Sequence, residues 1–227
     1  MTFPRARLTA ALTMTVATAV ASSLALVGTA RADDAQSGAS ATLMNPRSVE
    51  ASSVDPSVLT FPAATDEQTK IFILSTDSSD AILIESGGWY GIIDGGEDAD
   101  LPDGSDPRYP VRTGTAAAAG STTEWLMQYL DDQGVNDTNV AFYLGTHAHS
   151  DHIANADDII YKYRPKVILS PEYSDEWITD ENSLWDNQYV YDHLVNAANW
   201  AVDTYGATFI QKLDGYNTHI TLGGADL

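Results

Sequence analysis

Side chains that bind metal ions are concentrated in one short segment of the chain. Three of the five histidines lie within residues 147–152, where His147, His149, Asp151 and His152 form the pattern His-x-His-x-Asp-His. Imidazole nitrogens and carboxylate oxygens are ligands that zinc and similar divalent ions prefer. Because four such ligands this close together cannot all lie along one regular element, we expect a loop that curls around metal. The alternative interpretation is a solvated polar loop that happens to be rich in histidine.

The secondary structure predicted around residues 147–152 places these histidines at the end of a strand. The apolar run 140–144 directly precedes the histidines, and a helical pattern covers 153–163 after them. Further short apolar runs predict strands at 70–75, 81–85, 89–94, 166–170, 208–213 and 218–222, and helical patterns cover 121–133 and 187–205. Strands in series followed by alternating strands and helices predict a layered protein of α and β elements with a mixed sheet.

The beginning of the chain has the pattern of a secretory signal peptide. Arg5 and Arg7 precede an acid-free, mostly apolar stretch over 8–27, and Ala30-Arg31-Ala32 offers a small-x-small cleavage site. We expect residues 1–32 to be removed on secretion, because Thr and Ser interrupt the apolar run too often for a membrane anchor. Residues 33–68, which are rich in Ala, Ser, Asp and Pro, are expected to form a flexible tether before a domain at 69–227.

Charge narrows the possible partners. The chain has 32 acidic and 11 basic side chains, a formal charge of −21, and loss of three arginines with residues 1–32 would make it −24. Nucleic acid and anionic membranes would be repelled, so we expect neither as a partner after signal cleavage. The chain has no cysteine, so stability must come from its core and from bound metal rather than from disulfides. The oligomeric state is left open.

Taken together, the strand that ends at Asp94-Gly95-Gly96 and the later His-x-His-x-Asp-His pattern resemble the metallo-β-lactamase superfamily. The resemblance implies an α+β fold, an αββα sandwich with metals at the edge of its sheets. Segments 94–97, 101–106, 108–110, 173–175 and 184–187 are further similar to the catalytic modules of secreted bacterial phosphorylcholine esterases that act on teichoic acid. This second resemblance implies a secreted or cell-wall-associated phosphodiesterase.

The superfamily resemblance implies a role for each ligand. His147 and His149 would hold one zinc ion, and Asp151 and His152 would hold a second, so that two ions activate a shared hydroxide for hydrolysis. Asp94 would be either an outer-shell partner that orients a ligand histidine or a cap of the turn into Gly95. Asp151 and Asp94 are therefore the candidate catalytic residues.

Aromatic and acidic side chains offer a candidate substrate site. Aromatic faces combined with carboxylates hold quaternary ammonium groups well. By this chemistry Trp185, Tyr109, Tyr173 and Asp186 are candidates for binding a choline-bearing molecule or polymer. The alternative is that these aromatic side chains pack in the core or in turns.

The chain also departs from the superfamily pattern. The family supplies a bridging aspartate and at least one further histidine after the first motif, whereas we interpret His193 as a surface residue and His219 as a strand residue. We therefore expect 69–227 to be the N-terminal portion of a domain that is completed elsewhere. The alternatives are another hydrolase of this fold, such as a lactamase, lactonase or generic phosphoesterase, and a catalytically inactive binding module.

Overall fold

The computed structural model describes residues 46–76, 79–213 and 218–227. Its strands are β1 (Val49–Glu50), β2 (Thr60–Pro62), β3 (Lys70–Thr76), β4 (Ser79–Ser86), β5 (Trp89–Asp94), β6 (Val140–Leu144), β7 (Val167–Leu169), β8 (Thr208–Lys212), β9 (Thr221–Gly223) and β10 (Ala225–Asp226). Its α-helices are α2 (Thr122–Asp132), α3 (Ser150–Ile153), α4 (Ala156–Tyr163) and α5 (Asn187–Tyr205). The predicted signal peptide and the predicted tether up to residue 45 lie outside the described residues.

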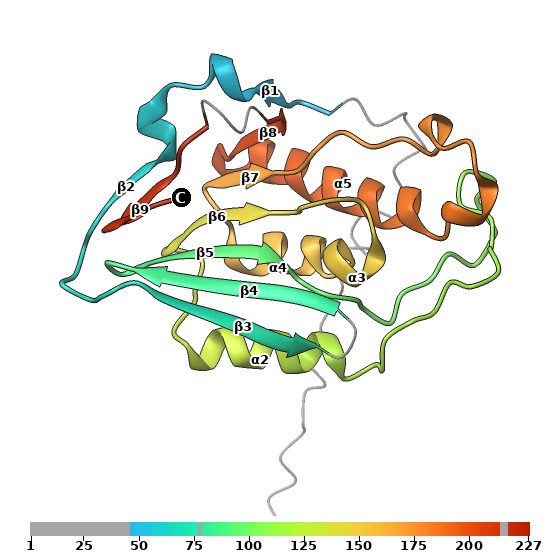
Figure 1. Ribbon diagram of the computed structural model, residues 1–227, viewed down its shortest axis with the longest axis horizontal. Coiled ribbons are helices and arrows are strands. Elements are labelled where there is room, and N and C mark those ends of the chain that lie inside the picture. Colours follow the sequence, from blue (N-terminus) through green and yellow to red (C-terminus); the bar gives the residue numbers. More distant parts are fainter. Residues whose placement is uncertain (1–45, 77–78, 214–217) are drawn as a thin grey trace, which may run out of the picture.

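Seven strands form one mixed sheet in the order β1-β8-β7-β6-β5-β4-β3 (Figure 1). β3, β4 and β5 are antiparallel neighbours, and Gly87 and Gly88 form the turn between β4 and β5 with positive φ angles. β5, β6, β7 and β8 are parallel, so each connection must cross the sheet, and α2, α3 with α4, and α5 supply these crossovers. The predicted mixed sheet flanked by helices is confirmed.

One face of the sheet packs against all the long helices. Strand residues such as Leu83, Tyr143 and Phe209 share a buried core with Leu126 of α2 and Leu194 of α5. Figure 1 shows these helices gathered on one side of the strands. The alternation of apolar residues along β4 explains this arrangement, because Ala81 and Leu83 face the helices while Ile82 and Ile84 face away from them.

The opposite face carries a smaller layer, of which the apolar patterns of the sequence predict only the strand near 218–222. β2, β9 and β10 form a three-stranded sheet, and Leu59, Phe61 and Leu222 pack with Phe142 and Ile210 of the large sheet. The segment 46–62 is therefore ordered against the core, which differs from the flexible tether expected over 33–68. Its few apolar residues follow no period, so only their burial against the sheet reveals their role.

Local differences from the predicted elements are small. The helix expected over 153–163 is divided into α3 and α4, with Asn155 as the N-cap residue of α4. The strand expected over 218–222 begins at Thr221, and α2 has Ser121 as its N-cap residue without the side-chain bond that a capping box would make. Among the described residues no helix is both long and apolar enough to cross a membrane.

Candidate active site

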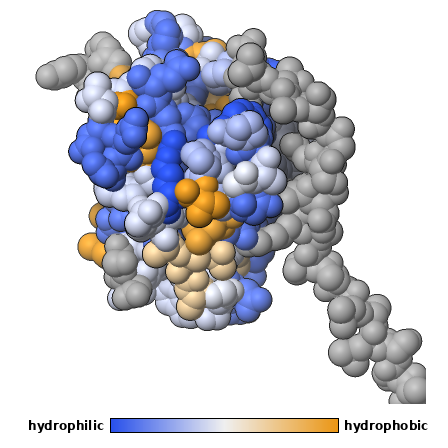
Figure 2. All heavy atoms as spheres, turned by 90° about the vertical axis from the view of Figure 1, so that its right-hand side faces the viewer, coloured by the Kyte–Doolittle hydropathy of each residue, from blue (hydrophilic) through white to orange (hydrophobic). Residues whose placement is uncertain are grey.

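The site lies where β5 and β6 end. The two strands are parallel neighbours, with Ile93 paired to Leu144, so Asp94 and the histidine loop that follows β6 reach the same edge of the sheet. Asp94 has a φ of 56°, in the left-handed region that Asp tolerates better than most residues, and the chain turns there into Gly95. Figure 2 views this edge, which is mainly hydrophilic around a small hydrophobic patch.

The Asp94 carboxylate is buried, with 3% of its surface exposed, and it holds the histidine loop in place. Its Oδ1 accepts a hydrogen bond from the Thr146 backbone N–H at 2.8 Å, and its Oδ2 accepts one from the Thr146 hydroxyl at 2.8 Å. The same Oδ2 lies 2.9 Å from Nδ1 of His152. Because a carboxylate only accepts, Nδ1 carries the proton and Nε2 presents its lone pair. This is the contact that an outer-shell partner of a ligand histidine makes.

Hydrogen bonds connect the turn after Asp94 to α3 and α4. The N–H groups of Gly95 and Gly96 both donate to the His152 carbonyl, at 2.7 and 3.2 Å. A Cβ atom on Gly95 would lie 2.7 Å from Cδ1 of Ile159, so a larger residue there would require the Ile159 side chain to shift. Asn155 is fully buried, and its amide donates to the carbonyls of Gly95, Gly96 and Glu97. The sheet edge and the ligand loop therefore form one unit.

His147 and His149 are the first predicted ligand pair. Nε2 of His147 lies 3.1 Å from Nδ1 of His149, and Nδ1 of His147 lies 3.0 Å from the Thr146 hydroxyl. Because that hydroxyl donates to Asp94, it accepts from Nδ1 of His147 and leaves Nε2 as a lone pair. Burial, reinforced by the neighbouring His152 and His149, lowers the pKa of His147, so the neutral imidazole that binds metal is favoured.

His152 and Asp151 are the second pair. Nε2 of His152 lies 3.7 Å from an oxygen of Asp151 and, equally, 3.7 Å from an oxygen of Asp80 at the start of β4. Asp80 is an acidic neighbour that the local motif does not reveal, because it lies 71 residues before Asp151 in the sequence. Nε2 of His152 thus has two carboxylates within 4 Å, Asp151 and Asp80.

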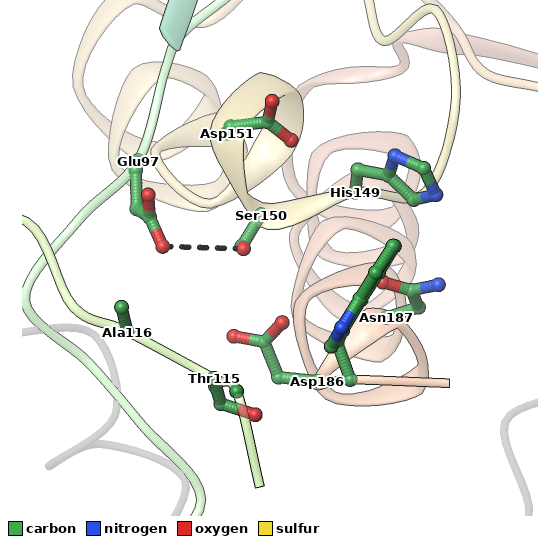
Figure 3. Close-up of a pocket in the computed structure, with 10 residues that line it drawn as sticks. Glu97, Thr115, Ala116, His149, Ser150, Asp151, Asp186 and Asn187 are labelled. Carbon is green, nitrogen blue, oxygen red and sulfur yellow. Dashed lines mark hydrogen bonds between the residues drawn. The ribbon is translucent and has the colours of Figure 1, made fainter. Parts of the chain in front are cut away.

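A pocket of about 320 Å³ opens beside His149. Its walls include Glu97, Ser150, Asp151 and Asp186. Figure 3 shows the carboxylates of Glu97 and Asp186 and the Ser150 hydroxyl pointing toward one another, with that hydroxyl 3.3 Å from Oε1 of Glu97. The carboxylate of Asp151 points away from them. Burial is the main cause that raises the pKa of both Glu97 and Asp186.

Asp186 carries a buried oxygen without a protein partner. Only 3% of the residue is exposed, and its Oδ2 finds no hydrogen-bond partner among the described residues. Trp185, the preceding residue, also lines the pocket, and its ring lies edge-on to His149 with centroids 5.4 Å apart. The pocket therefore combines an aromatic wall with unneutralised acidic groups, next to one of the two ligand pairs.

The sequence profile of the metallo-beta-lactamase superfamily matches residues 74–215, more than half of the chain. The chain belongs to the metallo-beta-lactamase superfamily. No curated protein sequence matches it closely enough to add a narrower assignment. Membership makes the protein a metal-dependent hydrolase in general, and members of the superfamily usually bind zinc.

The donor atoms of the site can be compared with the ligand geometry of zinc, the metal that the superfamily usually binds. Zinc binds nitrogen ligands at about 2.0–2.1 Å, so two nitrogens 3.1 Å apart, as in His147 and His149, suit neighbouring positions around one ion. Within the described parts of the chain, however, no three His, Asp or Glu side chains are placed so that they could hold one ion. The four side chains therefore remain two predicted pairs, and each ion would need further ligands beyond its pair.

Two of the predicted substrate residues, Tyr109 and Tyr173, are not among the described residues that line the pocket. The ten described residues that line the pocket of this superfamily member include Trp185 and Asp186 but not Tyr109 or Tyr173. The Tyr109 hydroxyl donates to Asp192 at 2.5 Å, and that of Tyr173 donates to Asp175 at 2.8 Å. Both rings also pack edge-on against tyrosines of α5. The two tyrosines thus support the loops around the pocket, and their contact with substrate stays a prediction.

The sequence analysis did not identify every residue of the site. Asn155 and Asp80 reach it through the packing of β4, β5 and the α3–α4 region. Glu97 lies in segment 94–97 and Thr146 adjoins His147, so the sequence placed both near the site without assigning them a role. His193 lies in α5 with its ring 4.2 Å from that of Tyr189, and His219 is exposed, so neither contributes to the ligand pairs.

Proposed function

We propose that the protein is a secreted, metal-dependent phosphodiesterase that removes phosphorylcholine, or a similar cationic phosphoester group, from surface polymers. The observation that carries the proposal is the buried, unpartnered Oδ2 of Asp186 in an acidic pocket beside His149. A buried carboxylate oxygen without a partner is unfavourable, so this oxygen favours a positively charged ligand.

The walls of the pocket suit a quaternary ammonium in particular. Such a group has no N–H to donate, and it is held by carboxylate charge together with contact to an aromatic face. Asp186 and Glu97 supply the charge, and Trp185 supplies the aromatic wall. The neighbouring His149 would place the phosphoester, attached to the ammonium by a short linker, at the metal ligands.

The charge of the whole molecule supports a zwitterionic substrate. At a formal charge of −21, the chain repels polyanions such as nucleic acid. A phosphorylcholine group carries one negative and one positive charge, so it has little net charge to be repelled. The acidic pocket then selects its positive end.

Each side chain at the edge of the sheet has a role in this proposal. His147, His149, Asp151 and His152 would hold the metal ions, and Asp94 would keep His152 in the ligating orientation. When bound, the ions supply a hydroxide of lowered pKa and neutralise charge on the phosphoester. Trp185 and Asp186 bind and orient the cationic end.

The test compares two substrates of the zinc-loaded, full-length protein. We expect turnover of p-nitrophenylphosphorylcholine, inhibition of that turnover by free phosphorylcholine, and a higher KM when Asp186 is changed to Asn. Turnover of bis-p-nitrophenyl phosphate, which has no ammonium group, should be affected little by Asp186→Asn, whereas phosphorylcholine should inhibit it too because it occupies the same site. Equal activity on both substrates, with no effect of phosphorylcholine, would instead indicate a generic phosphoesterase.

A further inference from the structure

Trp185 is only partly packed and lines two pockets. One is the acidic pocket of about 320 Å³ and the other is a pocket of about 550 Å³, and 39% of the residue is exposed. A side chain that lines open space in this way is not fixed by packing alone. Its backbone is also strained, with a φ of 34° in a region that bulky residues rarely adopt. Such a conformation persists only where its surroundings hold it.

Arg112 fixes the backbone of Trp185 by a hydrogen bond. One guanidinium nitrogen, Nη1, donates to the backbone carbonyl of Trp185 at 2.9 Å and to the carboxylate of Asp175 at 2.8 Å. The side chains of Arg112 and Asp175 are mostly buried, 23% and 17% exposed, so solvent screens this ion pair less than it screens a surface pair. Two residues after Arg112, Gly114 lies beside the same indole. The loop that carries Arg112 thus touches Trp185 through both its backbone and its ring.

The carboxylate partner of Arg112 is itself fixed to α5. The Asp175 backbone N–H donates to Gln188, and the Gln188 amide donates to Asp192 at 2.7 Å. Asp192 also accepts from Tyr109, and Asp175 accepts from Tyr173. This chain of bonds connects the loop before α2, the loop before α5 and α5 itself. Arg112 is the member that contacts Trp185 directly.

We propose that Arg112 is a positioning residue, which fixes Trp185 as the aromatic wall of the acidic pocket and thereby sets the preference for substrates with a quaternary ammonium. The inference rests on the proposed function. Because Nη1 alone makes both bonds, a lysine ammonium could also donate to both acceptors, but on its flexible stem it is less firmly oriented than the planar guanidinium.

Kinetics of three variants give the first test. We expect Arg112→Gln to raise KM for p-nitrophenylphosphorylcholine about three- to tenfold, the value of one aromatic contact to a cation. Its kcat, and its activity on bis-p-nitrophenyl phosphate, should stay within about twofold, as expected when binding common to ground and transition states is lost. Arg112→Lys should fall between. Arg108→Gln is the matched control, because Arg108 lies in the same loop but is exposed and pairs with Asp106 rather than with Asp175.

A spectroscopic test separates this inference from the proposed function. Fluorine NMR of protein labelled with 5-fluorotryptophan should give five signals, one for each tryptophan, and Trp185→Phe identifies the relevant one. We expect Arg112→Gln to shift or broaden that signal alone. An unchanged Trp185 signal with unchanged KM would overturn the inference, and so would movement of all five signals, since Arg112 would then support the fold in general. If the parent protein cleaves neither substrate, the proposed function fails, and the fluorine signal still decides the role of Arg112.

Discussion

Asp94 is the residue on which the geometry of the ligand loop depends most. It accepts three hydrogen bonds, two from Thr146 and one from His152, in a conformation with positive φ. Asn tolerates the same conformation and has nearly the same shape, so Asp94→Asn removes the charge with little change of the backbone.

We expect Asp94→Asn to weaken zinc binding by about 10- to 100-fold, as loss of an outer-shell carboxylate typically does. Competition between the protein and a chromogenic chelator would measure this change. Asp103→Asn, which alters an exposed carboxylate that only caps its own loop, is the control. Equal zinc affinity of parent and Asp94→Asn proteins would show that Asp94 merely stabilises the turn.

The pocket carboxylates predict a pH dependence. Because burial raises the pKa of Glu97 and Asp186, both lose their negative charge at a higher pH than exposed carboxylates do as the pH falls. Affinity for the ammonium group should therefore be greatest near neutral pH. As the pH falls, it should begin to decline at a pH above the range in which exposed carboxylates are protonated. The quantity to measure is the ratio of KM values for the choline and choline-free substrates between pH 5 and 8. A constant ratio would contradict the assignment, since metal loss affects both substrates alike.

At the scale of elements, Asn155 joins the end of β5 to the helices that carry the ligands. Its buried amide donates to three carbonyls, and its Oδ1 accepts from Thr123 of α2. Replacing it by Ala would leave buried carbonyls without donors, at a cost of about 1–3 kcal/mol for the worst affected group.

We expect Asn155→Ala to lower the free energy of unfolding by about 2–4 kcal/mol, combining lost bonds with unsatisfied buried groups. Thr123→Val, which removes only the bond to Oδ1, should cost about 1 kcal/mol. Urea unfolding of both variants would measure the two effects. Equal stability of Asn155→Ala and the parent protein would mean that water replaces the amide and that the junction is not specified by this residue.

The elements also show what the sequence can predict. Strands β3 to β6 and helix α5 follow from apolar runs and helical periods, because burial imposes those patterns locally. β1 and β2 are two and three residues long and exist only through pairing with β8 and β9, so their partners lie far away in the sequence. The four candidate ligands could be named from the sequence because they lie within six residues, whereas Asp80, Asn155 and Arg112 join the site through tertiary contacts.

At the scale of the whole molecule, charge should govern how substrates arrive. The acidic surface repels a purely anionic phosphodiester, and salt screens that repulsion over a Debye length of about 10 Å at 0.1 M. KM for bis-p-nitrophenyl phosphate should therefore fall as salt is raised, whereas KM for the zwitterionic p-nitrophenylphosphorylcholine should stay nearly constant or rise. Initial rates across a series of sodium chloride concentrations would show this. Parallel salt dependence of both substrates would contradict the electrostatic argument.

The central claim is that the loop of His147, His149, Asp151 and His152 makes this superfamily member a metalloenzyme. Elemental analysis of purified, tag-free, full-length protein after zinc supplementation and dialysis tests it most directly. The account predicts about two zinc or similar ions per chain, as in two-metal hydrolases, with a marked loss in His149→Ala and none in His193→Ala, whose histidine lies outside the loop. A metal content near zero, or an equal content in all three proteins, would contradict it.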